Sequence, residues 1–343
     1  MAMSPLGEAN KSISLSSAGH DLIQAAKLLA AARGDLNTAR QAAAQVGNPR
    51  VRDLMENARV GTKGAVNVGV MTDAIAWYQP LAEGFFASMA EFSALSKIYQ
   101  VGDWYNVALR TIIGVETTAP VGAAVSELAA KPLGSASFAT AKLEPSKSEG
   151  MIVITNELAR SISQAALLQF SRELRRAASI AADQKMLAIL AATPGMTTAA
   201  STGTTASQIL SDLTARVQAL TIGADSRLWW IVSPKLYKTI SLLQGTGGYL
   251  MVNNKIGQIN IAPSDAATTV ATLIDARQIA AELENVIISQ SSEAGLMLAD
   301  NPTSTGYQLV SMFSQNTTAI RAEIWFGCLA LRSTAVTTLT GYS

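Results

Sequence analysis

One segment of this sequence constrains the fold more than any other. Residues 131–161 read KPLGSASFATAKLEPSKSEGMIVITNELARS. The opening Lys131-Pro132-Leu133-Gly134 is typical of a loop, and the residues after it have the small and polar side chains of an exposed strand. The stretch 151–155 is far more apolar. The first half therefore predicts a long hairpin that buries too little surface for the chain's own core to hold it in place.

The composition indicates a surface that is covered by other protein. Apolar residues make up 49% of the 343 residues and charged residues 15%, whereas globular chains average about a quarter charged. So few charges suit a protein that packs against copies of itself. The net charge of +1 gives no basic field that would attract nucleic acid. The length leaves room for one large domain or two ordinary ones.

The single cysteine and the N-terminus bear on the cellular compartment. Cys328 excludes a disulfide framework, fits a reducing compartment and is expected to be a small core residue. No segment has the run of about 18 apolar residues that a membrane span needs. The first residues lack the basic start and apolar core of a signal peptide. We therefore expect synthesis in the cytoplasm and no membrane partner.

Periodic apolar residues predict the helices. Residues 21–45 read as one kinked or two short helices, and residues 73–95 as a helix that Pro80 and Gly84 kink or split. Residues 164–192 form the longest clear helix, roughly 43 Å at 1.5 Å per residue. Its predicted apolar stripe is Leu167, Phe170, Leu174, Ala177 and Ala181. Mostly off that stripe lie Arg172, Arg175, Arg176 and Asp183.

The rest of the chain reads as strands and a mixed unit. Residues 99–117 are expected to be strand, and residues 196–290 a separate α/β unit. Within that unit we expect a helix over 207–220, a buried strand in RLWWIVSP, and a helix over 235–243 capped by Ser233 and begun by Pro234. Residues 293–339 are rich in strand signals, with a period of two over 318–325.

Little in the sequence points to catalysis. His20 is the only histidine, and no cysteines or carboxylates join it at metal-ligand spacing. The loop GTGGY at 245–249 lacks the ending of a phosphate-binding loop, and the dinucleotide motif is absent. We expect no enzyme activity, no cofactor and no metal site. For the three arginines of the long helix, a solvated face is the first interpretation, a subunit contact the second, and nucleic acid the third.

Three stretches together resemble the major capsid protein family of tailed bacteriophages, which has the Hong Kong ninety-seven fold. The family's extended loop and the start of its spine helix are resembled by SELAAKPLGSASFATAKLEPSKSEGMIVITNEL. Its axial strand, helix and loop are resembled by WWIVSPKLYKTISLLQGTGGYLM, and its closing peripheral strands by SMFSQNTTAIRAEIWFGCLALR. The order and spacing of these stretches carry the resemblance, which covers residues 100–340.

The resemblance implies an α+β fold of the Hong Kong ninety-seven type. Its implied parts are an N-terminal helical arm or scaffold (1–60), an N-arm and the start of the peripheral domain (61–117), the extended hairpin loop (118–150), the peripheral domain with its spine helix (151–195), the axial α/β domain (196–290) and closing peripheral strands (291–343). In this family the hairpin lies over a neighbouring subunit, which would explain its weak intrinsic core.

The resemblance also implies a function and partners. The chain would be a major capsid, or head, protein that self-assembles into an icosahedral shell around double-stranded DNA. Its partners would be itself, as hexamers and pentamers, with a portal, decoration or scaffolding proteins, and DNA without sequence-specific contacts. The location would be the virion, after assembly in the host cytoplasm.

One branch of the family joins a hairpin lysine to an asparagine of a neighbour with the help of a glutamate. Lys131, Asn316 and Glu323 match this pattern loosely. A neutral lysine amine would attack the asparagine carbonyl while the carboxylate takes protons. Because Glu323 lies two residues from Arg321 and could pair with it, a shell without crosslinks is the preferred interpretation.

Two other functions stay open. The same fold could form an encapsulin-like compartment that encloses a cargo enzyme. A soluble α/β enzyme is the third hypothesis, and the shortage of histidine and the missing cofactor motifs argue against it.

Overall fold

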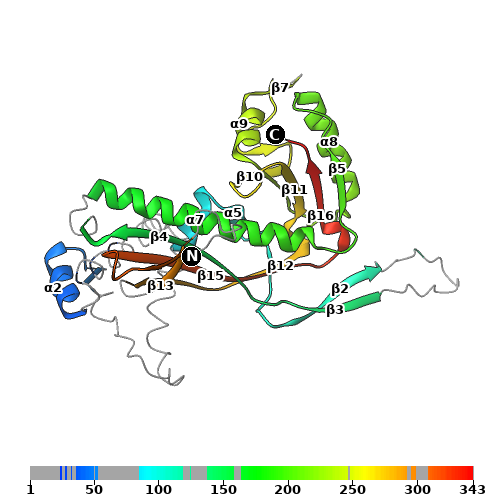
Figure 1. Ribbon diagram of the computed structural model, residues 1–343. Coiled ribbons are helices and arrows are strands. Elements are labelled where there is room, and N and C mark those ends of the chain that lie inside the picture. The colour runs from blue at the N-terminus through cyan, green and yellow to red at the C-terminus, as the bar shows by residue number, and fades with distance from the viewer. Residues whose placement is uncertain are drawn as a thin grey trace, which may run out of the picture. The chain divides into compact units, whose positions relative to one another are not determined.

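The structure is a computed structural model, shown in Figure 1, that describes residues 24, 28, 32, 36–49, 51–52, 85–118, 124, 137–157, 164–245, 248–291, 295–298 and 308–342. Its helices include α2 (Leu36–Val46), α5 (Ala94–Val101), α7 (Gln164–Ala191), α8 (Ala206–Ala219) and α9 (Pro234–Leu242), with short 3-10 turns at Met89–Glu91, Ala276–Gln278 and Ser333–Ala335. No described helix is long and apolar enough to cross a membrane.

The strands are distributed over the described chain after residue 104. They are β1 (Tyr105–Asn106), β2 (Ile112–Thr118), β3 (Ser137–Lys142), β4 (Ser146–Thr155), β5 (Thr197–Ala200), β6 (Leu228–Val232), β7 (Gln244–Gly245), β8 (Gly248–Tyr249), β9 (Lys255–Ile256), β10 (Ile259–Pro263), β11 (Val270–Asp275), β12 (Ile279–Ser291), β13 (Gly295–Leu298), β14 (Gln308–Ser311), β15 (Thr317–Ala330) and β16 (Val336–Thr340). Helices and strands alternate irregularly, which confirms the expected α+β class.

The described strands form five sheets, and the chain divides into two compact units. The larger sheets have the orders β1-β12-β15-β4 and β5-β16-β11-β6-β10-β9, and the two-stranded sheets are β2-β3, β7-β8 and β13-β14. The first unit consists of Met1–Glu91, Ser148–Ser179 and Asn285–Ile324, and the second of Phe92–Lys147, Ile180–Glu284 and Trp325–Ser343.

The second unit is built around the six-stranded sheet. Strand β6 pairs parallel with β10 and antiparallel with β11, and β11 pairs antiparallel with β16. One sheet face packs against α8 and α9 in a core that contains Ile209, Leu213, Trp230, Leu236, Ile240, Ile261 and Leu273. The Ser233 hydroxyl accepts a hydrogen bond from the Leu236 amide and caps α9. The expected buried strand and the expected capped helix are therefore present.

The sheet also contains a strand that the sequence assigned elsewhere. Residues 291–343 were expected to be closing strands of the other domain, but β16 lies between β5 and β11 of the six-stranded sheet. It is buried at Val336, Thr337 and Leu339. Its partner β11 lies more than sixty positions earlier in the sequence. Sequence periodicity reports that a strand exists, but it does not report which distant strand it pairs with.

Two boundaries before the hairpin also differ from expectation. The helical run predicted for 73–95 is described from residue 85, and it breaks before Ser93, whose hydroxyl caps the new helix α5. Helix α5 ends at Gly102, where φ is +74°, so the strand expected from residue 99 begins later. Strand β2 already belongs to the hairpin because its Ile112 pairs with Lys142 of β3. The hairpin thus starts earlier than residue 118.

Helix α7 confirms the predicted long helix but not its predicted apolar stripe. The fully buried apolar positions are Leu174, Ala178, Ala182, Met186 and Leu190, while Phe170, Ala177 and Ala181 are half-buried. The stripe is therefore turned by about one residue. The cause in the first unit is a close contact with β4, because a methyl group added at Gly150 would lie 2.5 Å from the Ala178 backbone nitrogen.

Strand β15 likewise departs from simple alternation. Exposure recurs every fourth residue along it, and both of its faces are mostly covered. The period of two expected at 318–325 is therefore weak in the structure, as it is for strands that are buried on both sides.

Candidate assembly surfaces

One exposed element of the second unit is the ribbon formed by β2 and β3, which we call the hairpin ribbon. In the described chain its two strands pair only with each other. Every residue of β3 except Ala141 is exposed. Among its large apolar side chains, Ile112 is 70% exposed and Phe138 is 62% exposed. The sequence prediction of a hairpin that its own core does not hold is confirmed for these residues.

The register assigns the ribbon's side chains to two different faces. Ile113 pairs with Ala141, and Val115 pairs with Ala139. Residues directly opposite in an antiparallel pair share a face, so these four apolar side chains lie together on one side. The other side carries Ile112, Lys142, Thr140 and Phe138. One face of the ribbon is thus wholly apolar at these positions, although nothing in the described second unit buries it fully.

The base of the ribbon is fixed to the second unit. Leu143 is fully buried, its carbonyl accepts from the Arg110 amide at 2.8 Å, and its amide donates to the Thr111 carbonyl at 3.1 Å. Strand β15 passes directly against it, since a methyl group added at Gly327 would lie 2.3 Å from a Leu109 side-chain carbon and 3.0 Å from Leu143. The ribbon is therefore attached to the second unit through a buried and hydrogen-bonded base.

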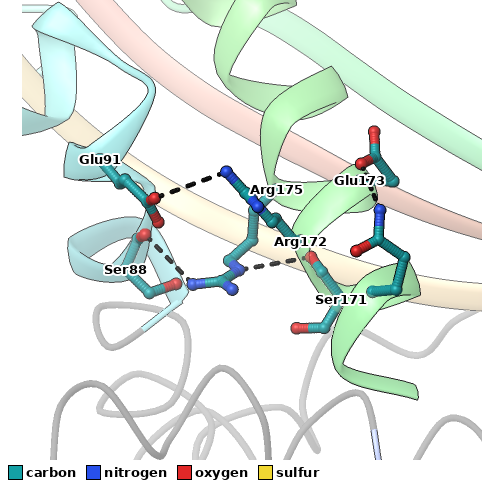
Figure 2. Close-up of polar contacts among 7 residues, drawn as sticks. Ser88, Glu91, Ser171, Arg172, Glu173 and Arg175 are labelled. Carbon is teal, nitrogen blue, oxygen red and sulfur yellow. Dashed lines mark hydrogen bonds and ion pairs between the residues drawn. The ribbon is translucent and has the colours of Figure 1, made fainter. Parts of the chain in front are cut away.

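A second candidate surface is the arginine group of α7 in the first unit, shown in Figure 2. Arg175 donates to the carbonyl oxygens of Ser88 at 3.4 Å and Ser171 at 3.3 Å. Burial lowers the pKa of Arg175, and Glu91 partly offsets this by raising it. Arg172 lies 3.9 Å from Glu91, with both side chains exposed. Arg175 is therefore a structural tie, whereas Arg172 fits the first interpretation, a solvated face.

The second unit contains a buried carboxylate whose role the sequence analysis missed. Asp183 is fully buried, although it lies off the apolar stripe that was predicted for the helix. It accepts hydrogen bonds from the Ser93 hydroxyl at 2.7 Å, the Ala94 and Leu95 amides at 2.8 and 3.1 Å, and the Ser264 hydroxyl at 2.5 Å. Burial raises its pKa, against the opposing effect of these hydrogen bonds.

Asp183 therefore joins three elements of the second unit. It satisfies the first amides of α5, where the helix dipole favours a negative charge, and it holds Ser264 after β10. A signal was present in the sequence, because Asp183 follows the Ala-rich stretch 177–182 of the helix, and an acid on that part of the helix needs a partner if its face is buried.

Two of the three crosslink candidates, Asn316 and Glu323, lie among the described residues. Lys131 lies outside the described residues. Asn316 sits in the turn before β15 with φ of +51°, and its side-chain oxygen accepts from the Asn156 side-chain nitrogen at 3.0 Å. Glu323 is seven residues further on, about 23 Å along an extended strand, and pairs with Arg321 at 2.7 Å. The crosslink stays a prediction about contacts between copies.

The described residues include no group of three or more His, Cys, Asp or Glu side chains that could hold a metal ion. Burial raises the pKa of the Cys328 thiol to about 12. Such a thiol is neutral at cellular pH and unreactive. His20 lies outside the described residues.

Comparison with known proteins identifies a relative. No family model matches the sequence. A curated protein described as a capsid polyprotein, from Pseudomonas phage PAJU2, is 28% identical over 320 residues, a match that covers 82% of this chain and 48% of that protein. The chain therefore spans about half the length of the curated relative that it matches.

Solved structures show looser similarity. A chain from Mycobacterium phage Ogopogo matches with a TM-score of 0.47 and 14% identity, over 73% of this chain and 92% of that chain. A virus-like particle from Pyrococcus furiosus matches with a TM-score of 0.47 and 11% identity, over 77% of this chain and 99% of that chain. The sequence match carries more weight than either, and by it this chain is similar over most of its length to a phage capsid protein, as the three quoted stretches predicted.

Proposed function

We propose that this protein is the major capsid protein of a tailed phage or prophage. Copies of it assemble into an icosahedral shell that encloses double-stranded DNA. The observation that carries the proposal is the hairpin ribbon, which projects from a fixed base and exposes both of its strands. The similarity to the PAJU2 capsid polyprotein supports the same function.

The ribbon needs a neighbour for a physical reason. A two-stranded hairpin is marginally stable in water by itself, and this one presents an apolar face of Ile113, Val115, Ala139 and Ala141. Packing that face on another subunit buries it and orders both strands. Since every copy carries the same ribbon and the same acceptor surface, the contact repeats and can close into a symmetric shell.

The role that we propose is structural. The carboxylates with several hydrogen-bond donors, such as Asp183, are occupied in holding elements together. Hexamers and pentamers of this chain are the principal partners, and a portal and scaffolding or decoration proteins would complete the particle. The protein would enter the virion after assembly in the host cytoplasm, and its contacts with DNA would be to the backbone rather than to bases.

The first test is whether purified protein assembles. Light scattering and negative-stain microscopy should show capsomers or closed shells, because the low-charge surface must be covered. A monodisperse monomer at every salt and protein concentration would contradict the proposal. The contents of particles formed in cells separate the two kinds of shell: nuclease-protected DNA indicates a capsid, and a co-purifying enzyme indicates an encapsulin-like compartment.

A further inference from the structure

One region of the second unit carries positive charge without negative charge, although the net charge of the whole chain is only +1. Residues 228–264 contain the three lysines Lys235, Lys238 and Lys255 and no aspartate or glutamate. All three side chains are exposed. We call these three residues the lysine patch. A net charge close to zero therefore conceals a local excess of cations.

Two lysines of the patch lie on the outer face of α9. The opposite face of this helix is buried, because Leu236 and Ile240 belong to the core of the six-stranded sheet. Residues three apart on a helix are neighbours on its surface. Lys235 and Lys238 are three apart and both exposed, so they present their charges together on a helix that the core holds in place.

A tight turn fixes the third lysine. Asn253 and Asn254 have φ of +52° and +61°, as in the two-residue turn of a hairpin, and the flanking residues exchange backbone hydrogen bonds at 2.9 and 3.0 Å. The Tyr237 hydroxyl donates to the Asn254 side-chain oxygen. Lys238 directly follows Tyr237, and Lys255 directly follows Asn254. This contact therefore brings the lysines of the helix and of the hairpin to one region.

The lysine patch is not neutralised by the part of the chain that the structure describes. None of its members forms an ion pair with a described residue, whereas Arg110 pairs with Glu284 at 2.8 Å. Lys238 lies over the ring of Tyr237, 5.7 Å from its centroid. Lys235 is in the first turn of α9, at the positive end of the helix dipole, where acidic side chains are favoured. An external anion would offset both positive contributions.

We propose that the lysine patch binds the phosphate backbone of the double-stranded DNA that the shell encloses. This inference rests on the proposed function and names the surface that meets the DNA. Double-stranded DNA carries one negative charge per about 1.7 Å of helix axis, so three exposed cations meet phosphates without a fixed register. Contacts from lysine to phosphate carry no sequence information, which suits a shell that encloses a whole genome.

The test neutralises the lysine patch in the full chain. The triple variant Lys235→Gln, Lys238→Gln and Lys255→Gln is compared with wild type for binding to a fluorescent DNA duplex of mixed sequence, by anisotropy between about 50 and 200 mM salt. Each phosphate contact contributes about 0.9 to the slope of log affinity against log salt. The triple variant should therefore have a slope smaller by about 2.7, so its affinity should fall about 40-fold less than that of wild type over this range.

Two controls separate charge from other effects. The triple variant Lys235→Arg, Lys238→Arg and Lys255→Arg keeps the three charges and should bind the duplex as wild type does. Lys185→Gln removes one charge from an exposed position of α7 outside the lysine patch and should leave the salt dependence unchanged. All variants should keep the wild-type melting temperature, because the substituted side chains are exposed.

Particles formed in cells give the second measurement. The triple Gln variant should form shells in normal number that retain less nuclease-protected DNA. Duplex binding with the wild-type salt dependence would overturn the inference. So would a loss of empty shells in the absence of DNA, because the lysines would then contact another protein. If wild type forms no particles, the proposed function fails, and duplex binding by the unassembled protein still decides whether the lysine patch binds DNA.

Discussion

At the scale of single residues, Asp183 is a buried carboxylate of the second unit that accepts four hydrogen bonds, from Ser93, Ala94, Leu95 and Ser264. Replacing it with Asn turns one acceptor oxygen into a donor that faces either the Ala94 or the Leu95 amide. An orphaned buried amide costs about 1–3 kcal/mol, so Asp183→Asn should lower the free energy of unfolding by that amount in urea at pH 7. The control Asp225→Asn removes an exposed carboxylate and should stay within about 0.5 kcal/mol. Equal stability of the two variants would show that the Asp183 carboxylate is not needed.

Gly150 is the residue that permits β4 to lie against α7 in the first unit. Its added methyl group would meet the Ala178 backbone nitrogen at 2.5 Å, and a backbone atom cannot move aside as a side chain can. We expect Gly150→Ala to destabilise the first unit by about 1–3 kcal/mol through overpacking. Gly114→Ala is the matched control, because its methyl group would meet only the Phe138 side chain at 3.7 Å or more. Thermal melting of both variants measures the difference.

At the scale of elements, the hairpin ribbon and its base should separate assembly from folding. Ile112 and Lys142 are directly paired, so a short Gly-Ser turn can join them in place of residues 113–141. This deletion should leave the melting of the second unit unchanged and abolish particles, since the ribbon adds little to the core. By contrast, Leu143→Ala should lower the free energy of unfolding by about 2–5 kcal/mol, because Leu143 is fully buried. Global unfolding of the deletion variant by circular dichroism would refute the projecting ribbon.

At the scale of the whole molecule, two carboxylates of the second unit give it opposite dependences on pH. Burial raises the pKa of Asp183, so its contribution is fully present below the unfolded value of about 3.9 and is lost as pH rises through the folded pKa. For Asp212, burial raises the pKa, but the hydrogen bonds from Thr202, Tyr342 and Ser201 outweigh it and lower the pKa overall. Its contribution is present above about 3.9 and is lost as pH falls through the folded pKa.

Urea midpoints between about pH 3 and pH 7 would resolve these two contributions. Asp183→Asn should remove the decline of stability as pH rises above about 4, and Asp212→Asn should remove the decline on acidification. If one of these variants kept the wild-type dependence of stability on pH, the carboxylate that it lacks would not titrate in this range.

The sequence by itself determined the elements that depend on neighbouring residues. The length of α7, the capping of α9 by Ser233 and the exposed strand β3 all follow from local spacing and from which side chains are small or polar. The order of the quoted stretches was also enough to point to a phage capsid protein, which the PAJU2 relative supports.

Only the tertiary structure decided what depends on distant segments. The apolar stripe of α7 is turned from its predicted position because Gly150, more than twenty positions away in sequence, packs closely against the backbone of Ala178. Asp183 became a core residue because α5 and Ser264 supply its four donors. Strand β16 joined the second unit by pairing with β11. Periodicity in the sequence indicates which side chains are buried. It does not indicate which distant segment buries them, because that depends on contacts between residues far apart in the chain.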